Sequence, residues 1–325
     1  YMFRMQIQSK KKCIWYCSAA VSFLLFLLLN LWCDHLVNMQ DAQQMAGRWS
    51  EKKDVAQISC FFSSKAEVTE DTIQSFEYSL KNVLQEASIT ETSENPSARL
   101  WVDAYSADGK ITLVNGRNTL DANAIGIGGD FFLFHPLKLI TGSYFSGNDL
   151  MQDYCIIDQD AAWQLFGSND VVGMTVYIGN VPHIVTGVVR RPQGRMEKAA
   201  GLTSTVVYVS YETLEAYGTS NGINHYEIVM PNPVDEFAYG KVKEGIGIDE
   251  KNVEIVENSR RYSLPNRIKT ILAFGTRSMN GKAIIYPYWE NLARGYEDII
   301  ALLTVFMLFL LLFPVVTVIW CFVHW

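Results

Sequence analysis

Two long segments without a single charged residue lie near the two ends of this 325-residue chain. They cover residues 13–33 (CIWYCSAAVSFLLFLLLNLWC) and 299–323 (IIALLTVFMLFLLLFPVVTVIWCFV). Each is long enough to cross the hydrocarbon core of a bilayer, which needs ~20 residues of helix. Tryptophans stand near their ends, where an indole can sit at the membrane interface: Trp15, Trp32, Trp320 and Trp325. The pattern predicts transmembrane helices at 13–33 and 299–325.

A cleaved signal peptide is the alternative for the first segment. Its apolar run is longer than a signal core, and no small-x-small cleavage site follows it. A lipoprotein signal would place a small residue before Cys33, but Trp32 stands there. The residues therefore favour an uncleaved span.

Charge predicts the orientation of these spans. Residues 1–12, the expected cytoplasmic tail, contain four basic residues and no acid. All 34 acidic residues fall between Asp34 and Asp298 together with the other 23 basic residues, which makes that region net −11. The positive-inside rule therefore places the tail in the cytoplasm and the large acidic region outside the cell membrane. An acidic surface also argues against nucleic acid as a partner, because phosphate binding favours basic patches.

Motifs of catalysis and metal binding are missing from the printed sequence. The five histidines are scattered, with no H-x-x-x-H, and there is no C-x-x-C, so we expect no metal site. No G-x-S-x-G nucleophile motif is present, and the acids fall mainly in turns and on helix faces. We expect no enzyme and no cofactor in this chain. Cys60 and Cys155 lie outside the spans, and a disulfide between them is left open.

Apolar residues at helical spacing continue each span outward. One stripe comprises Met39, Ala42, Ala46 and Trp49, and the other comprises Trp289, Leu292, Tyr296, Ile299 and Leu303. Such stripes predict stalk helices at 34–54 and 266–298. Packing of the two stalks on each other is the simplest interpretation, and transmission of movement is the further one.

The region between the stalks, 55–265, is typical of an α+β domain. Strands are predicted at 55–63, 99–105 and 111–114, with a turn at Asp108–Gly109. Thr69 is a candidate N-cap for a helix with an apolar face. Later strands are predicted at 225–230 and 253–256 around a helix that begins near Asp235. The β-α-β pieces at the two ends could pair with each other.

A second compositional block separates those pieces. It has a strand at 155–157, a short helix at 161–166, a hairpin over Gly179–Asn180, and a strand at 206–209. The stretch from Arg190 to Gly201 (RRPQGRMEKAAG) is turn-rich and predicts a mobile loop. Its basic residues are either possible partner contacts or a soluble surface: Arg190, Arg191, Arg195 and Lys198.

The glycines of IGIGGDFF (125–132) suggest a nucleotide loop at first sight. Phe131 stands where the third glycine of G-x-G-x-x-G belongs, and Pro136 soon follows, which disfavours a helix for a pyrophosphate. No G-x-x-x-x-G-K-[ST] occurs in the printed sequence. We therefore expect these glycines to serve turns and close backbone packing.

Residues 111–217 resemble the MacB-type extracytoplasmic core domain of ABC transporter permeases, the superfamily that includes LolC/LolE and FtsX. The first motif that carries the resemblance runs from Gly126–Ile127 through Phe131–Phe132 and Leu137–Gly142 to Phe145 and Asp149. A second motif comprises Leu165–Phe166–Gly167, Val172–Gly173 and Val185–Val188. The signature positions, expected to be structural, are Gly126, Phe131, Phe132, Leu139, Gly142, Phe145, Leu165, Phe166, Gly167, Gly173 and Gly187.

The resemblance implies membrane helices plus an α+β extracytoplasmic domain on a helical stalk. The domain would have two subdomains, a discontinuous βαβ-rich part and an inserted mostly-β part at about 150–220. It further implies a cytoplasmic ATPase subunit that carries ATP and Mg, a second permease copy or paralogue, and membrane lipid around the spans. Family permeases have four spans, and this chain starts at Tyr1 and stops after two, so we expect it to be part of a longer protein.

The resemblance implies a permease of the mechanotransmission type, in which ATP hydrolysis by the partner moves the outer domain. The cargo would be a peptide, a lipid-linked molecule or a drug. Two alternatives stay open: a two-span sensor with an outer ligand-binding domain, and an FtsX-like regulator of a cell-wall hydrolase. A signalling module directly after Trp325 would favour the sensor.

Overall fold

The protein is described from a computed structural model that covers residues 2–50, 54–90, 99–277 and 281–323, with side chains from residue 13 onward. The side chains of the basic tail, and Trp325, lie outside the described residues. Within them the chain divides into two compact units. One comprises residues 1–40, 262–278 and 294–325, and the other comprises residues 41–261 and 279–293. We call them the membrane unit and the core domain.

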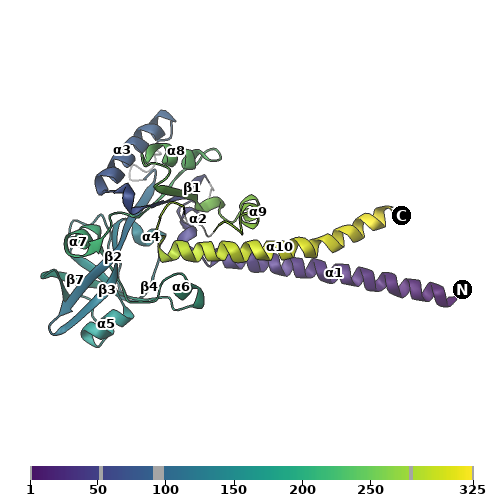
Figure 1. The fold of residues 1–325 in the computed structure, drawn as a ribbon, viewed down its shortest axis with the longest axis horizontal. Coiled ribbons are helices and arrows are strands. Elements are labelled where there is room, and N and C mark those ends of the chain that lie inside the picture. Colours follow the sequence, from purple (N-terminus) through teal and green to yellow (C-terminus); the bar gives the residue numbers. More distant parts are fainter. Residues whose placement is uncertain (1, 51–53, 91–98, 278–280, 324–325) are drawn as a thin grey trace. The chain divides into compact units, whose positions relative to one another are not determined.

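The membrane unit consists of α1 (Met2–Asn38), α9 (Leu264–Leu272) and most of α10 (Tyr288–Val323). Both α1 and α10 are long and apolar enough to cross a membrane. They lie side by side with opposite direction: the Trp15 indole donates to Thr317 Oγ1 at 2.9 Å, and Ser22 Oγ donates to the Leu310 carbonyl at 2.6 Å (Figure 1). Pro314 falls inside α10, which membrane helices tolerate.

The predicted stalk helices were wrong in their extent. Helix α1 ends at Asn38, and a 3₁₀ turn (Asp41–Gln43) and the short α2 (Met45–Trp49) follow it. Helix α10 begins only at Tyr288, and the chain between α9 and α10 is not helical where it is described. Residues 51–53 and 278–280 of the predicted stalks lie outside the described residues.

Packing between the two long helices includes part of the second predicted stripe, since Tyr296, Ile299 and Leu303 lie against residues of α1. Cys33, Leu36, Ile300 and Met307 form a buried apolar cluster, with Tyr296 against it. The stripe at 42–49 instead packs in the core domain with Met45. The helical period therefore predicted the partner of part of the second stripe and missed that of the first.

Eleven strands form one sheet in the part of the core domain that the structure describes. Its main order is β11-β1-β10-β2-β3-β8-β5-β7-β4, while β6 pairs with β2 and β7, and β9 pairs with β2. The strands are β1 (Val55–Phe62), β2 (Val102–Asn115), β3 (Asn118–Gly129), β4 (Lys138–Gly142), β5 (Tyr154–Asp158), β6 (Thr175–Ile178), β7 (Val181–Arg190), β8 (Val206–Ser210), β9 (Thr219–Ser220), β10 (His225–Pro231) and β11 (Val253–Glu257).

Helices cover both faces of this sheet. One face packs on α3 (Glu70–Glu86), α5 (Gln159–Phe166), α7 (Tyr211–Tyr217) and α8 (Phe237–Gly245). The other face packs on α2, α4 (Phe131–Phe134) and the first turn of α10. In Figure 1, α3 and α8 lie next to each other beside β1. Remaining short helices are the 3₁₀ turns Ser64–Ala66 and Asn258–Arg260, and α6 (Arg195–Ala199).

Burial on both faces explains why β1 is apolar at most positions. Because side chains alternate along a strand, Ile58 and Cys60 enter the core beneath α3 and α8, while Ser59 points to the opposite face. Helix α3 begins after Thr69, and its Ile73, Phe76, Leu80 and Leu84 are buried, as its apolar period predicts.

Pairing of the two ends of the domain is confirmed. Strand β1 lies between β10 and β11 and is antiparallel to both, so the first strand of the domain is hydrogen-bonded to the last two. The hairpin over Gly179–Asn180 is also confirmed: both residues have positive φ (56° and 67°), as a type I′ turn requires.

The turn predicted at Asp108–Gly109 was wrong. Strand β2 runs through both residues and turns only after Asn115. A Cβ on Gly109 would stand 2.4 Å from the Thr219 carbonyl oxygen, so the glycine permits close approach of β9 rather than a reversal of the chain.

Cys60 and Cys155 are both buried free thiols, so the disulfide left open by the sequence is not formed. Their strands, β1 and β5, are separated in the sheet by β10, β2, β3 and β8. At ~4.8 Å per strand their backbones are ~24 Å apart, well beyond the ~7 Å limit for a disulfide. Burial raises the pKa of the Cys155 thiol to about 12, so it stays protonated.

Candidate functional site

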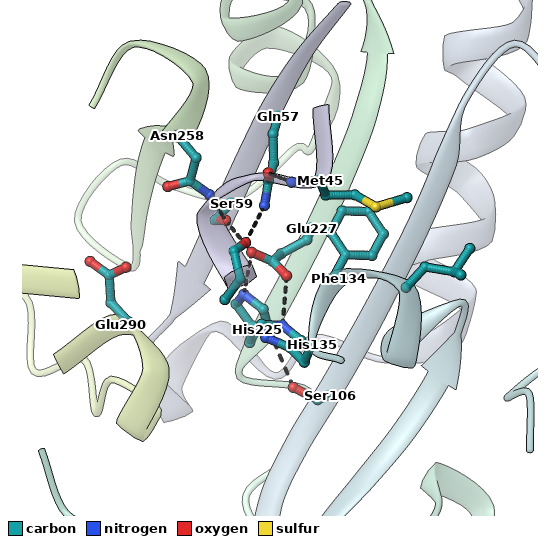
Figure 2. A network of polar contacts seen from close by, with 12 residues as sticks. Met45, Gln57, Ser59, Ser106, Phe134, His135, His225, Glu227, Asn258 and Glu290 are labelled. Atoms are coloured by element: carbon teal, nitrogen blue, oxygen red, sulfur yellow. Dashed lines mark hydrogen bonds and ion pairs between the residues drawn. The ribbon is translucent and has the colours of Figure 1, made fainter. Parts of the chain in front are cut away.

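A buried cluster of ionisable side chains lies on the sheet face beneath the first turn of α10. It comprises His135, His225 and Glu227, and each of the three is at most 4% exposed. Figure 2 shows their side chains converging, with Glu227 between the two histidines. We call this group the His–Glu cluster. All of its members belong to the core domain.

Strand geometry explains how β10 supplies two of the three residues. His225 and Glu227 are two positions apart, so both side chains point to the same face of the sheet. Neighbouring strands present hydroxyls directly opposite them: Ser106 of β2 pairs with His225, and Ser59 of β1 pairs with Glu227. His135 comes from the residue that ends α4, whose three buried phenylalanines anchor it on the sheet.

The contacts around Glu227 fix the orientation of its carboxylate. Ser59 Oγ donates to Oε1 at 2.6 Å, and Asn258 Nδ2 donates to Ser59 Oγ at 2.6 Å. His135 Nε2 stands 2.7 Å from Oε2, while His225 Nε2 stands 3.5 Å from Oε1. The serine–asparagine chain is visible in Figure 2. One carboxylate oxygen is therefore occupied by a hydroxyl, and the other faces His135.

Burial and charge set the protonation of these groups. Burial opposes ionisation of Glu227, but the adjacent His135 and His225 hold the pKa of this carboxyl below its ordinary value. Burial lowers the pKa of His135, because an imidazolium is poorly solvated inside the domain.

Aromatic rings enclose the histidines. The ring of Trp289, in the first turn of α10, lies 4.3 Å from that of His135 and 5.3 Å from that of His225 between centroids. Phe131 lies 4.6 Å from His135, and Phe61 lies 5.0 Å from His225. These rings keep the cluster in an apolar, water-poor surrounding.

A buried ion pair fastens the same turn of α10. Arg261 and Glu290 are 2% and 1% exposed at their side chains, and two hydrogen bonds of 2.7 Å join them. Arg261 also donates to Asn258 Oδ1 at 3.2 Å, so the ion pair and the His–Glu cluster share the Asn258 side chain. The first turn of α10 is thus held by polar contacts as well as by Trp289.

The signature residues that the resemblance singled out are spread over both cores. Phe131, Phe132, Phe145 and Leu139 pack on the face that carries the His–Glu cluster. Leu165 and Phe166 pack on the other face, and Gly167 ends α5 with a φ of 71°. Gly173 has a φ of 82° with no heavy atom near its missing Cβ.

The remaining signature glycines lie at close backbone approaches. Gly126 has no room for a Cβ because Leu214 would be 2.7 Å away. Gly142 and Gly187 face each other across β4 and β7, and a Cβ on Gly142 would meet backbone at 2.1 Å. These residues shape the sheet around the site and do not enter the cluster.

The basic residues predicted as a partner-contact loop have divided roles. Arg190 ends β7, residues 191–194 are irregular as predicted, and Arg195 and Lys198 lie on the short α6, which the sequence did not predict. These three are exposed. Arg191 instead pairs with Asp158 at 2.5 Å and with Asp160, which leaves it 13% exposed.

Sequence spacing did not reveal the His–Glu cluster. His135 precedes the other two residues by a long stretch of chain, and only the pairing of strands and the position of α4 bring them together. The usable signal was His-x-Glu within an otherwise apolar strand, HYEIVM, where two polar side chains share one buried face.

Together, two apolar helices and a two-faced α+β domain between them are typical of a membrane-anchored protein. Residues 39–255 match the family of MacB-like periplasmic core domains. The match covers more than half of the chain, so the chain belongs to this family.

Curated relatives match a shorter stretch. The macrolide export ATP-binding/permease protein MacB of Pasteurella multocida is 31% identical over 98 residues, which are 30% of this chain and 14% of that protein. The corresponding protein of Neisseria gonorrhoeae is 36% identical over 80 residues, 24% of this chain and 12% of the relative. The chain thus spans about a seventh of the length of these relatives.

Solved structures give similar neighbours. The periplasmic region of MacB from Actinobacillus actinomycetemcomitans aligns with a TM-score of 0.43 at 17% identity, covering 69% of this chain and 94% of that one. The extracellular domain of the ABC-type transporter YknZ from Gram-positive bacteria aligns with a TM-score of 0.40 at 18% identity, covering 62% and 99%.

Proposed function

We propose that this chain is the membrane-spanning permease part of an ABC transport system of the MacB/FtsX type. The observation that carries the proposal is a MacB-like periplasmic core domain over residues 39–255 with an apolar helix on each side. The basic N-terminal tail supports a cytoplasmic N-terminus, and the acidic region supports an outer position for the core domain.

A separate subunit would hydrolyse ATP in this system. The printed sequence holds no Walker A motif, which supports an ATPase on another polypeptide or another part of the protein. Its ATP and Mg²⁺ would bind there. A second copy of the permease or a paralogue would complete the assembly, and lipid would surround the spans.

Helix α10 supports mechanical coupling between the membrane and the core domain. It is one 36-residue helix whose first residues belong to the core domain and whose remainder belongs to the membrane unit. Trp289 and Glu290, 4% and 1% exposed, fix its first turn in the domain. Because no loop interrupts the helix, a displacement of the span would pull directly on the sheet face that carries the His–Glu cluster.

The cargo proposed for this movement is a peptide, a lipid-linked molecule or a drug that is met outside the membrane. In this mechanism the core domain would change shape around cargo, and no channel through the two helices is required. Regulation of a cell-wall hydrolase, as FtsX performs, would use the same movement.

Interruption of α10 tests the coupling. Three glycines inserted after Arg294 would break the helix between the two units, and the same insertion at the exposed Gly116–Arg117 turn is the matched control. The full-length protein with its ATPase is placed in nanodiscs. A spin label on Tyr78→Cys, a position 73% exposed on α3, reports the distance between two copies with and without ATP and vanadate. Exposed cysteines of the spans are replaced by alanine beforehand.

The α10 insertion should preserve ATP hydrolysis and abolish the nucleotide-dependent change in distance, while the control insertion keeps both. A nucleotide-dependent change that survives the α10 insertion would refute mechanical coupling through this helix. Failure of any ATPase to co-purify with the full-length protein would refute the permease proposal. A soluble signalling module encoded directly after Trp325 would support the sensor instead.

A further inference from the structure

Three buried side-chain atoms of the His–Glu cluster lack a hydrogen-bond partner among the described residues. They are Nε2 of His135, Nε2 of His225 and Oε2 of Glu227. His135 Nε2 and Glu227 Oε2 are 2.7 Å apart as an ion pair, yet they do not meet with hydrogen-bond geometry. Buried polar atoms are seldom left without partners, since each such atom costs ~1–3 kcal/mol. Three in one place indicate a group that all of them face.

The atoms form a donor set suited to a transition metal. Two imidazole nitrogens and one carboxylate oxygen are ligands that Zn²⁺ takes in protein sites. One such atom from each residue lies within 4.8 Å of the others. Ligands of a tetrahedral zinc stand ~3.3 Å apart, as follows from bonds of ~2.0–2.1 Å. The spacings in the cluster bracket that value, so small side-chain rotations would suffice.

Neighbouring hydroxyls hold the ligands as an outer shell would. Ser106 Oγ lies 3.3 Å from Nδ1 of His225, which leaves Nε2 directed at the cluster. Ser59 donates to Oε1 of Glu227, which leaves Oε2 facing Nε2 of His135. Metal-bound histidines and carboxylates are usually oriented by such second contacts on their far atoms.

We propose that His135, His225 and Glu227 supply three ligands to a divalent transition metal of the zinc class, with one water completing a four-coordinate site. The ion would join β10 to the end of α4 beneath Trp289. Its ligand Glu227 is hydrogen-bonded to Ser59, and Ser59 is hydrogen-bonded to Asn258. Asn258 in turn accepts from Arg261, whose ion pair holds the first turn of α10. The enclosure by aromatic rings implies that the ion enters as the domain folds. The proposal does not depend on the transport function.

Metal analysis of the full chain in detergent tests the site. The protein is expressed without a polyhistidine tag, stripped with a chelator under mild denaturation, refolded with Zn²⁺ or Co²⁺, and measured by elemental analysis. The expected result is about one metal per chain, with the intense visible bands of a low-symmetry, four-coordinate Co²⁺ site. Wild-type protein that binds neither metal, or that gives only a weak octahedral Co²⁺ spectrum, would overturn the proposal.

Substitutions locate the ion. Glu227→Gln and His225→Gln should each reduce the bound metal to a small fraction of wild type, and Ser59→Ala should weaken affinity by about 10- to 100-fold. His183→Gln is the matched control, because His183 is a buried histidine outside the cluster, bonded to Thr213. Equal metal content in wild type and both ligand variants would refute the assignment. Where a ligand variant fails to fold, the wild-type Co²⁺ spectrum decides.

Discussion

Breaking the Arg261–Glu290 pair should destabilise the core domain strongly. Both side chains are almost fully buried and joined by two hydrogen bonds of 2.7 Å, so Glu290→Gln leaves the guanidinium without its carboxylate. Removing one partner of a buried ion pair costs ~3–5 kcal/mol. In a domain of this size 1 kcal/mol moves Tm by ~2–4 °C, so a fall of ~6–20 °C is expected.

The assay is thermal unfolding in detergent, followed by fluorescence, since Trp289 adjoins Glu290 and is buried. The double variant Arg261→Met with Glu290→Leu should recover much of the loss, because no charge is then left buried. Glu250→Gln, which breaks the exposed Lys243–Glu250 pair, should leave Tm unchanged. Single variants within ~2 °C of wild type, or a double variant with the summed loss of both, would refute the reasoning.

Three further outcomes follow from burial and charge. Gly128→Ala should lower the free energy of unfolding by ~1–3 kcal/mol, because its Cβ would stand 1.9 Å from a tyrosine ring. Gly47→Ala in α2 has open space around its Cβ and should be neutral or stabilising. Urea unfolding compares the two variants, and equal effects would contradict the packing. Burial and a nearby glutamate raise the pKa of Asp103 well above its ordinary value. The folded state therefore keeps a proton that the unfolded chain releases, and stability falls as pH rises from the unfolded pKa to the folded pKa of this group. Asp103→Asn should therefore raise Tm at about pH 8 and change it little at about pH 4; a gain of the same size at both would exclude this cause. Arg191→Ala should lower Tm, because it removes the ion-pair partner of two aspartates. Arg195→Ala should leave Tm unchanged, because Arg195 is exposed. A larger loss of Tm for Arg195→Ala than for Arg191→Ala would contradict these roles.

Local patterns predicted much of the core domain. Helix α3, the Gly179–Asn180 hairpin and the pairing of β1 with β10 and β11 were all foreseeable, because periodicity, turn residues and β-α-β order act over short stretches. Gly109 shows the limit of that approach. A glycine after an aspartate predicts a turn, but here the missing Cβ makes room for a distant strand.

The His–Glu cluster could not be predicted because its members are joined by tertiary structure only. His135 follows a short helix, and its distance from β10 depends on how α4 packs on the sheet. The stalk prediction erred for a related reason. Residues 42–49 keep a helical period after α1 has ended, so the period alone could not show that they pack in the core domain.

The position of β1 has a consequence for biogenesis. This strand leaves the membrane first, but both of its hydrogen-bonded neighbours, β10 and β11, are made almost last. Such long-range pairing slows folding, so the edge of β1 must wait unpaired while most of the domain is synthesised and exported. Helix α10 begins at Tyr288, after β11 (Val253–Glu257) and α9, so the domain can close only shortly before the second span is made. A truncation or stall before β10 would therefore leave an aggregation-prone strand tethered at the membrane surface.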